Sequence, residues 1–458
     1  MEKANQSANS TLAEMCAYIA HSGEARLPED VIARAKHHIL DTLAAIVSGS
    51  FLKPGLLAGR FARAQSGVGE TQVIGSPTLT SSINAAFAHG MMAHADETDD
   101  SHPGSRGHPG CALVPAALSV AEREGADGLS FLRGVVAGYD IGCRITQALG
   151  VQSLRGRGHS THAFGNNFGA AAAAASILRL KENLVPYVVS YAAQQASGLI
   201  YWVRDDEHVE KAFVFGGMPA RNGVTAAILV QSGFTGVQDA FSGDHNFLQT
   251  FSTDPKPRVL TSGLGSRYEI MFTNIKKFCV GSPIQAAVDA LLCLMVRHGF
   301  GVDEVERMVV RLPADAARTV DNRSMPDINV QYILSVTLLD RGLSFEAAHS
   351  FDRMQDSRVR EIIERIILVK DQELSTADDK RQGIVEVVTK DGTRLREHVV
   401  NVRGTVENPM SREEVETKCS ELMRPVLGAD RTRGLIEKIW HLEDIGDVRE
   451  LRPFLYQP

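Results

Sequence analysis

Apolar side chains recur at steps of three and four residues through most of the first 270 residues, which is the spacing of a buried helix face. The segment 31–47, VIARAKHHILDTLAAIV, carries one such stripe. The segments 111–122 and 169–180 are richer in alanine and apolar on most sides, as expected of helices that pack closely in a core. The pattern therefore predicts a large, mainly helical region in this part of the chain.

The spacing changes near residue 268. A helix is predicted over 284–297, and the β-branched run RMVVRLP follows at 307–313. Further on, apolar residues alternate on both sides of Lys390-Asp391-Gly392, the composition of a tight hairpin turn. Strands and helices thus alternate here, which predicts a smaller α+β region.

Helical spacing returns after Gly404. Ser411 and Glu414 stand three residues apart, as in a capping box at a helix start. The segment 433–445 continues with an amphipathic pattern. We therefore expect the last segment to rejoin the helical region.

The length of the chain, 458 residues, exceeds the size at which a single core keeps growing, so two domains are expected. The predicted fold class is mainly α. We expect an all-helical domain built from residues 1–268 and 405–458, with a smaller α+β domain, 269–404, inserted near the C-terminal end.

Composition narrows the function classes. The net charge of -7 and the absence of a basic cluster disfavour nucleic acid and anionic membranes as partners. We find neither a signal peptide nor about twenty consecutive apolar residues, so we expect a cytoplasmic protein. The six cysteines are scattered singly and predict reduced thiols rather than disulfides or a metal cluster. No phosphate-cradling loop or dinucleotide fingerprint is present, so we expect no cofactor.

The stretch 94–110, HADETDDSHPGSRGHPG, crowds three histidines and four carboxylates into a predicted helix-loop-helix junction. Three interpretations are open. The stretch is a solvated loop, or it is a zinc or iron site, or it performs general acid-base catalysis with Glu97 or Asp99 beside His108. The ligands of the metal site would be His94, Asp96, Asp99 and His102. Histidine is suited to moving a proton near neutral pH, which favours the catalytic interpretation.

A second group of candidates, His159 and His162, lies in RGHSTHAFGNNFG at the start of the alanine-rich helix. A helix N-terminus attracts carboxylates. His159 is the better candidate, whereas we interpret His162 as a core residue more readily than as a functional one. Lys211 could bind a substrate carboxylate, although it is equally explained as a solvated helix end. Lys276 and Lys277, at the predicted domain boundary, could reach the same cleft.

Taken together, these motifs resemble the 2-methylcitrate dehydratase family, also called MmgE/PrpD, whose other members include cis-aconitate decarboxylase and iminodisuccinate epimerase. The resemblance covers nearly the whole chain. Its segments are HILDTLAAIVSGS, NAAFAHGMMAHADETDDSHPGSRGHPGCALVPAALSVAE, VVAGYDIGCRI, GHSTHAFGNNFGAAAAAA, ARNGVTAAILVQSGFTG and ENPMS.

The resemblance implies the same two domains, an active site between them and a homodimer. It places the first aspartate of the family's acidic motif on Glu97, its threonine on Ser101 and its histidine before proline on His108. The family's second histidine falls on His159, with His162 one possible shift away, and its lysine falls nearest to Lys211.

Two departures from the family pattern bear on the reaction. The segment KKFCVGSPIQ lacks the histidine that many members carry there, which argues against a mechanism that needs this group, as in the decarboxylase. Glu97 replaces an aspartate and so extends the carboxylate by one methylene, which suggests a different substrate.

The sequence thus predicts a cofactor-independent lyase that dehydrates, or hydrates in reverse, a small hydroxy di- or tricarboxylate resembling 2-methylcitrate. We expect His108 and His159 to transfer protons and Glu97 and Asp99 to orient them. Lys211, Arg106 or a helix N-terminus would neutralise charge on the substrate carboxylate. Further side chains expected to contact the substrate are Ser101, His102, Arg106, His162, Lys276 and Lys277. The alternatives are an epimerase or isomerase of a small dicarboxylate, a cis-aconitate-type decarboxylase, or a non-catalytic helical binding protein.

Overall fold

The computed structural model describes residues 2–65, 67–375 and 381–456. The chain divides into two compact units. Unit 1 contains Met1–Ala95, Asp99–Thr273 and Glu414–Pro458. Unit 2 contains Asp96–Thr98 and Asn274–Glu413.

The unit boundaries differ in detail from the sequence-based expectation of 269–404 for the smaller domain. Unit 2 begins at Asn274. Glu269 lies in unit 1, and its contacts explain why: its carboxylate is 3.6 Å from the guanidinium of Arg144 and 3.2 Å from the imidazole of His102, both in unit 1. Unit 2 also includes the short segment Asp96–Thr98, which no sequence pattern had separated from its neighbours.

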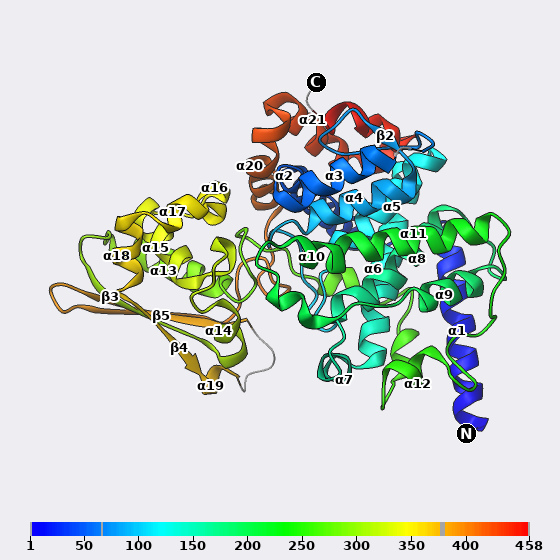
Figure 1. Ribbon diagram of the computed structural model, residues 1–458, viewed down its shortest axis with the longest axis horizontal. Helices are drawn as coiled ribbons and strands as arrows, with labels where there is room; N and C mark the ends of the chain where they lie inside the picture. Colours follow the sequence, from blue (N-terminus) through cyan, green and yellow to red (C-terminus); the bar gives the residue numbers. More distant parts are fainter. Residues whose placement is uncertain (1, 66, 376–380, 457–458) are drawn as a thin grey trace. The chain divides into compact units, whose positions relative to one another are not determined.

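Unit 1 is built almost entirely of helices, as Figure 1 shows. Its longer helices are α1 (Glu2–Ser22), α2 (Glu29–Gly49), α3 (Lys53–Gln65), α4 (Ser82–Ala93), α5 (Gly110–Glu124), α6 (Gly128–Leu149), α8 (Thr161–Ile177), α9 (Val185–Gln194), α11 (Met218–Gln231), α20 (Arg412–Leu427) and α21 (Ala429–Trp440). Its shorter elements are α7 (Val151–Gly156), η1 (Ile200–Arg204), α10 (Val209–Ala212), η2 (Phe213–Gly217), α12 (Phe247–Phe251), η3 (Pro257–Leu260), η4 (Glu269–Phe272), η6 (Leu442–Asp444) and η7 (Val448–Phe454). Two strands of two residues each, β1 (Thr71–Gln72) and β2 (Leu79–Thr80), interrupt the otherwise all-helical pattern.

The alanine-rich helix α8 lies at the centre of unit 1, against α6 and α11 (Figure 1). Every one of its residues is buried. Small residues allow this packing: a Cβ atom at Gly165 would lie 2.5 Å from the carbonyl oxygen of Gly142 in α6. The run of alanines predicted to pack closely is therefore a core helix, as expected.

The C-terminal segment returns to unit 1, where α21 packs against α2 (Figure 1). Helix α20 begins at Arg412, directly after Ser411. In α20, the ammonium group of Lys418 lies 2.6 Å from the carboxylate of Asp41 in α2, and both side chains are buried. The predicted return of the last segment to the helical region is thus secured by a buried ion pair.

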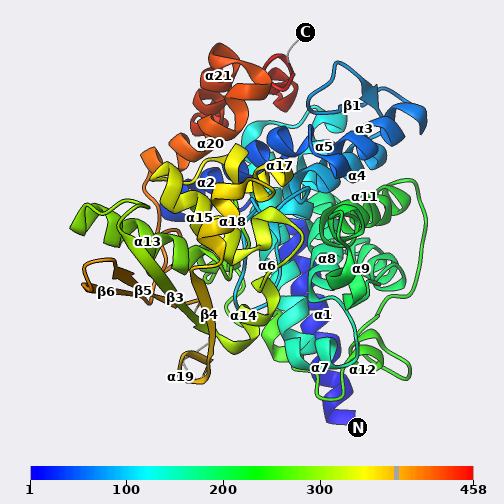
Figure 2. The same ribbon diagram turned by 60° about the vertical axis from the view of Figure 1, so that its left-hand side comes forward.

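Unit 2 combines helices with a four-stranded sheet, visible in Figure 2, in the order β4-β3-β5-β6. Its strands are β3 (Val305–Pro313), β4 (Ile366–Asp371), β5 (Gly383–Thr389) and β6 (Arg394–Val399). Its helices are α13 (Gln285–His298), α14 (Ala314–Val320), η5 (Pro326–Ile328), α15 (Val330–Asp340), α16 (Phe345–His349), α17 (Phe351–Met354), α18 (Ser357–Ile363) and α19 (Gln372–Ser375). Strands β3 and β4 pair in parallel, whereas the other neighbours pair antiparallel.

The predicted hairpin joins β5 to β6. Asp391 accepts a hydrogen bond from the Thr393 amide at 3.0 Å, and Gly392 adopts φ 87°, which favours glycine. Helix α13 packs on β5, β6 and α15, so that the apolar side chains of the sheet and these helices form one core.

Among the described residues, the helical stretch Val209–Gln231 is long and apolar enough to cross a membrane, judged by length and composition alone. This finding corrects the expectation that no segment has this length and composition. Within its apolar window, 72% of the residues are buried inside the protein. The stretch comprises α10, η2 and α11, and its burial is that of a core helix of unit 1.

Candidate functional site

The loop between α4 and α5 carries the acidic and histidine-rich motif, and its C-terminal end is held by Asp100. This buried carboxylate accepts hydrogen bonds from the Gly110 amide at 2.9 Å, from Tyr139 Oη at 2.5 Å and from His38 Nδ1 at 2.9 Å. The first amide of α5 and two side chains from neighbouring helices thus fix the loop. The adjacent residue, Asp99, consequently has a defined orientation.

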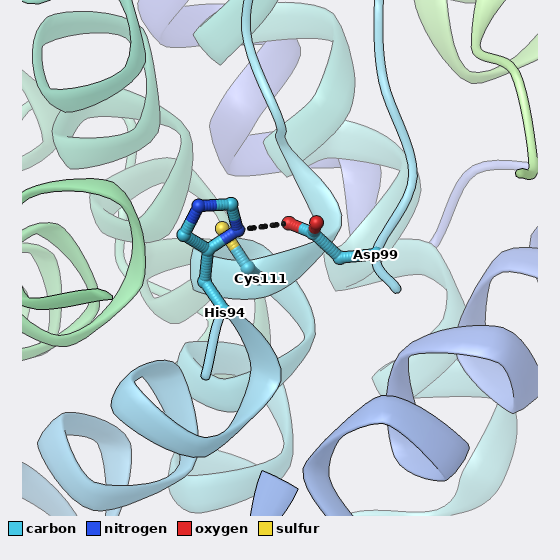
Figure 3. A group of neighbouring side chains, drawn as sticks. All are labelled: His94, Asp99 and Cys111. Atoms are coloured by element: carbon cyan, nitrogen blue, oxygen red, sulfur yellow. Dashed lines mark hydrogen bonds and ion pairs between the residues drawn. The ribbon is translucent and has the colours of Figure 1, made fainter. Parts of the chain in front are cut away.

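Asp99 binds two histidines at once. Its Oδ2 lies 2.9 Å from His94 Nδ1, as Figure 3 shows, and its Oδ1 lies 3.1 Å from His108 Nδ1. A carboxylate can only accept, so the Nδ1 atom of each ring carries the proton. The Nε2 atom of each neutral ring is then left with its lone pair.

The two histidines differ in their access to solvent. The His94 side chain is completely buried, and its Nε2 has no hydrogen-bond partner among the residues that the structure describes. Burial lowers the pKa of His94 in spite of the charge of Asp99. The His108 side chain is 12% exposed, so His108 is the more accessible of the two histidines.

A short π-helical segment, η2, places an aromatic ring against this group. The ring of Phe215 stacks on the ring of His94, with 4.2 Å between the centroids. The backbone carbonyl oxygen of Phe215 accepts a hydrogen bond from Asn166 Nδ2 at 2.8 Å. The widened turn leaves this carbonyl available, and π-helical turns often occur at functional sites. Asn166 also donates to the His108 carbonyl at 2.8 Å, so a single amide fixes both segments.

His162 lies on the other side of Phe215, with ring centroids 3.7 Å apart. Burial holds the pKa of His162 well below its usual value, and the neighbouring His108 and His94 lower it further. A ring in this setting stays neutral and packs as an aromatic side chain. The structure therefore favours the core interpretation of His162.

His159 is more accessible than His162. Its neighbouring rings are Phe164 at 5.3 Å and Phe251 at 5.5 Å, and its backbone forms a bridge with Leu199. Partial burial and the charge of Arg157 lower the pKa of His159. The structure thus places His162, and not His159, in ring contact with His108, which lies 5.2 Å from His162.

Lys211 supplies the positive charge near the histidine cluster. Its ammonium group lies 5.4 Å from the centre of the Phe215 ring and 5.5 Å from that of Trp202. The charge of Lys211 contributes to the lowered pKa values of His94 and His162. A cation over aromatic rings beside neutral imidazoles is suited to binding a carboxylate.

Two other predicted residues, Glu97 and Lys276, meet in unit 2. Lys276 Nζ lies 2.8 Å from the Glu97 carbonyl oxygen and 3.3 Å from its carboxylate. Both side chains are buried. Lys277 lies 3.5 Å from Asp289 and is partly exposed.

Three further residues that were predicted to contact the substrate lie in the loop between α4 and α5: Ser101, His102 and Arg106. His102 is buried, and its two ring nitrogens lie 3.0 Å from Ser105 Oγ and 3.2 Å from Glu269. Both nitrogens are therefore engaged within unit 1. Arg106 has φ 44° and accepts a hydrogen bond from Thr161 at its carbonyl oxygen, whereas Ser101 is half-buried.

The structure brings together a different potential metal-ligand set from the one predicted. His94, Asp99 and Cys111 offer ligand atoms within 4.8 Å of one another (Figure 3). Two of the predicted ligands have other partners, since Asp96 pairs with His349 at 2.8 Å and His102 with Glu269. The Cys111 thiol donates to the His108 carbonyl at 3.0 Å, and Asp99 pairs with His94 Nδ1 at 2.9 Å.

Sequence reasoning missed three residues that define these sites: Phe215, Trp202 and His349. Phe215 stands in FVFGG, where the two glycines signal a close approach of the backbone. Gly216 indeed packs so tightly that a Cβ atom there would lie 2.0 Å from the Gly90 carbonyl oxygen. His349 stands alone in a short helix and carries no comparable signal.

Two family models and several known proteins match this chain. The profile of the MmgE/PrpD N-terminal domain matches residues 13–260, and that of the MmgE/PrpD C-terminal domain matches residues 278–443. The cis-aconitate decarboxylase-like protein oryM of Aspergillus oryzae is 26% identical, over 96% of this chain and 96% of its own. The cis-aconitate decarboxylases of Homo sapiens and Aspergillus terreus are 25% and 23% identical, over 94% and 97% of this chain and 92% and 96% of theirs. Since both profiles and these relatives together span most of its length, the chain belongs to the MmgE/PrpD family.

Proposed function

We propose that this protein is a lyase that moves a proton at a carbon atom next to a carboxylate in a small polycarboxylate, with dehydration of a hydroxy acid as its reaction. The observation that carries the proposal is the contact of Asp99 with two histidines, of which His108 is partly exposed. A carboxylate on Nδ1 leaves Nε2 of His108 as a base. His94, fully buried on the other oxygen, keeps the carboxylate oriented.

The proposed reaction is an elimination. His108 Nε2 takes the proton from the carbon next to a carboxylate, the C–H electrons form the new double bond, and the C–O bond to the hydroxyl breaks. The departing hydroxide accepts a proton and leaves as water. His159 is the candidate donor of this second proton. It is more exposed than His162, whose ring stacks on Phe215.

Negative charge grows on the substrate carboxylate as the proton leaves, and cations must compensate for it. Lys211 is the candidate in unit 1, because it stands over Phe215 and Trp202 beside the histidine cluster. Lys276 is the candidate in unit 2, where its contact with Glu97 fixes its position. We propose that Lys211 is a carboxylate-binding residue of unit 1 and that Lys276 is a carboxylate-binding residue of unit 2.

Decarboxylation is the second candidate, because relatives over nearly the full length are named cis-aconitate decarboxylases. In that reaction a C–C bond breaks, carbon dioxide leaves, and the electron pair stays on carbon until a protonated His108 delivers a proton. The absence of a histidine from KKFCVGSPIQ places this candidate second. Both reactions use the same histidine and differ in what leaves.

A substrate screen with two detectors separates the candidates. Purified protein is incubated with citrate-like, malate-like and iminodicarboxylate acids and with cis-aconitate, while ultraviolet absorbance reports alkene formation and a coupled assay reports carbon dioxide. We expect alkene formation from a hydroxy tri- or dicarboxylate without carbon dioxide. Carbon dioxide release from cis-aconitate would show that the reaction is decarboxylation and not dehydration. If neither detector responds, proton magnetic resonance in deuterated water follows, and solvent exchange without net product would indicate an epimerase.

The same screen tests the catalytic assignment and the metal interpretation. His108→Asn should remove turnover while the circular dichroism spectrum stays that of the wild type. Dialysis against a chelator should leave the rate unchanged, because the two oxygens of Asp99 are engaged by His94 and His108 and the Cys111 thiol is engaged by a backbone carbonyl. A rate lost with chelator and restored by zinc would overturn the metal-free mechanism, and binding without any turnover would favour a non-catalytic protein.

A further inference from the structure

The segment Asp96–Thr98 belongs to unit 2, although the residues before and after it in the chain belong to unit 1. Two cationic side chains of unit 2 hold it. His349 Nε2 lies 2.8 Å from Asp96 Oδ2, and Lys276 Nζ lies 2.8 Å from the Glu97 carbonyl oxygen. Adjacent residues of the loop are therefore each held by a separate side chain.

Asp96 is held on both sides. Its carboxylate is buried and accepts hydrogen bonds from the Thr98 amide at 2.9 Å and from Thr98 Oγ1 at 2.6 Å. These two bonds close a turn around Glu97, because the acceptor precedes it and the donors follow it. The conformation of the Glu97 peptide thus depends on where the Asp96 carboxylate points.

His349 is itself fixed. It is the last residue of α16, its Nδ1 lies 2.7 Å from the Phe345 carbonyl oxygen, and its ring packs on the Phe345 ring at 4.1 Å. With Nδ1 donating to a carbonyl, Nε2 is the atom directed at Asp96. The imidazole therefore links a helix of unit 2 to the loop through both nitrogens.

The pair is ionic at neutral pH. Burial alone would lower the pKa of His349, but the hydrogen bond and charge of Asp96, together with the charge of Asp327, raise it to about 9. Burial raises the pKa of Asp96, and the contacts with His349 and Thr98 lower it below its usual value. A cation and an anion that are both buried attract each other more strongly than they would in water.

We infer that His349 is a positioning residue, which fixes the Glu97–Lys276 pair through its contact with Asp96. The inference rests on the proposed function, in which Lys276 binds a substrate carboxylate. His349 contacts Asp96 on one side and Phe345 on the other. It acts by keeping the Glu97 carbonyl and carboxylate where Lys276 meets them, at 2.8 and 3.3 Å.

Two substitutions at one position separate the two contacts of His349. The amide nitrogen of Gln takes the place of Nε2, so His349→Gln keeps a donor toward Asp96. The amide nitrogen of Asn takes the place of Nδ1, so His349→Asn keeps the contact with Phe345 and loses the one with Asp96. We expect KM to rise about tenfold or more in H349N, with a smaller rise in H349Q and little change of kcat in either.

A matched control lies in the same unit. His398 Nε2 lies 2.9 Å from Gln382 Oε1, and His398→Asn removes this contact far from the loop in sequence. We expect H398N to keep the wild-type KM. The double variant D96A/H349N should lose no more than the worse of its two single variants, because both remove the same contact.

A readout without turnover separates this inference from the proposed function. Amide hydrogen exchange of the full chain, followed by mass spectrometry on a peptide covering 94–100, reports the Thr98 amide that donates to Asp96. H349N should accelerate exchange in this peptide about tenfold or more, whereas H398N should not. Unchanged exchange in H349N, a KM equal to that of the wild type, or losses that multiply in the double variant would each overturn the positioning role. Absence of turnover in the wild type would overturn the proposed function alone.

Discussion

A single carboxylate determines the chemistry of the histidine cluster. Asp99 is fully buried, and each of its oxygens accepts a hydrogen bond from one Nδ1 atom, of His94 and of His108. In both imidazoles the proton therefore lies on Nδ1, the nitrogen that meets the carboxylate. Only His108 also reaches solvent. The two rings share the same partner and differ in their access to solvent. We therefore propose that His108, and not His94, takes the proton from the substrate.

Asp99→Asn tests this arrangement. An amide can donate as well as accept, so it no longer dictates that Nδ1 of His108 carries the proton. We expect kcat to fall about a hundredfold or more, in keeping with the loss of an oriented general base. Steady-state rates measure the effect, and Asp254→Asn, at an exposed position of unit 1, is the matched control. Equal rates for D99N and D254N would contradict the assignment.

The two histidines near the start of α8 should respond differently to substitution. His162→Phe keeps an aromatic ring stacked on Phe215 and should retain activity within about tenfold, because the mechanism assigns no proton transfer to His162. His159→Asn removes a group that titrates and should lower kcat about a hundredfold. Rate measurements on both variants decide the matter. A larger loss in H162F than in H159N would exchange their roles.

At the scale of elements, the cluster depends on a π-helical segment that packs against α4 without side chains between them. Gly216 of η2 and Gly90 of α4 are in direct backbone contact, and a Cβ atom on Gly90 would lie 2.5 Å from the carbonyl carbon of Gly216. This approach sets where the Phe215 ring meets His94. The paired glycines are therefore a packing requirement of the site.

Gly216→Ala should destabilise the protein by about 1–3 kcal/mol, because two backbone segments have to separate to admit the methyl group. Urea unfolding monitored by circular dichroism measures the change in the free energy of unfolding. Gly156→Ala is the control, since a Cβ atom there meets nothing within 4 Å, and its effect should stay within about 0.5 kcal/mol. Equal stabilities for G216A and G156A would show that η2 moves freely.

At the scale of the whole molecule, the C-terminal segment completes unit 1. The buried pair of Lys418 and Asp41 joins α20 to α2, residues far apart in the sequence. Removing one partner leaves the other buried without its counter-ion, which costs far more than losing a surface pair. The first and last parts of the chain are therefore expected to unfold together.

Lys418→Met should lower the free energy of unfolding by about 3–5 kcal/mol, and adding Asp41→Asn should recover part of the loss. The exposed pair of Lys438 and Glu450 provides the control, because Lys438→Met should cost less than about 1 kcal/mol. Denaturant titration measures all three variants. A loss in K418M no larger than that in K438M would contradict the joining role.

The sequence was informative where periodicity and turn chemistry determine structure, as in α2, α8 and the hairpin after β5. It was less informative where a side chain's partner comes from a distant segment. Nothing in the order of residues tells that Asp96 pairs with His349 while Asp99 pairs with His94 and His108. The types of residue in the motif were sufficient to suggest acid-base chemistry, but their partners depend on tertiary contacts that spacing does not encode.

The most direct test of the account is exchange of the substrate's carbon-bound hydrogen for deuterium. An acid turned over by the wild type is incubated in deuterated water, and proton magnetic resonance follows the signal of the carbon next to the carboxylate with wild-type protein and with H108N. The account predicts exchange or alkene formation with the wild type and a rate at least about a hundredfold lower with folded H108N. Equal rates of proton removal by the two proteins would contradict it.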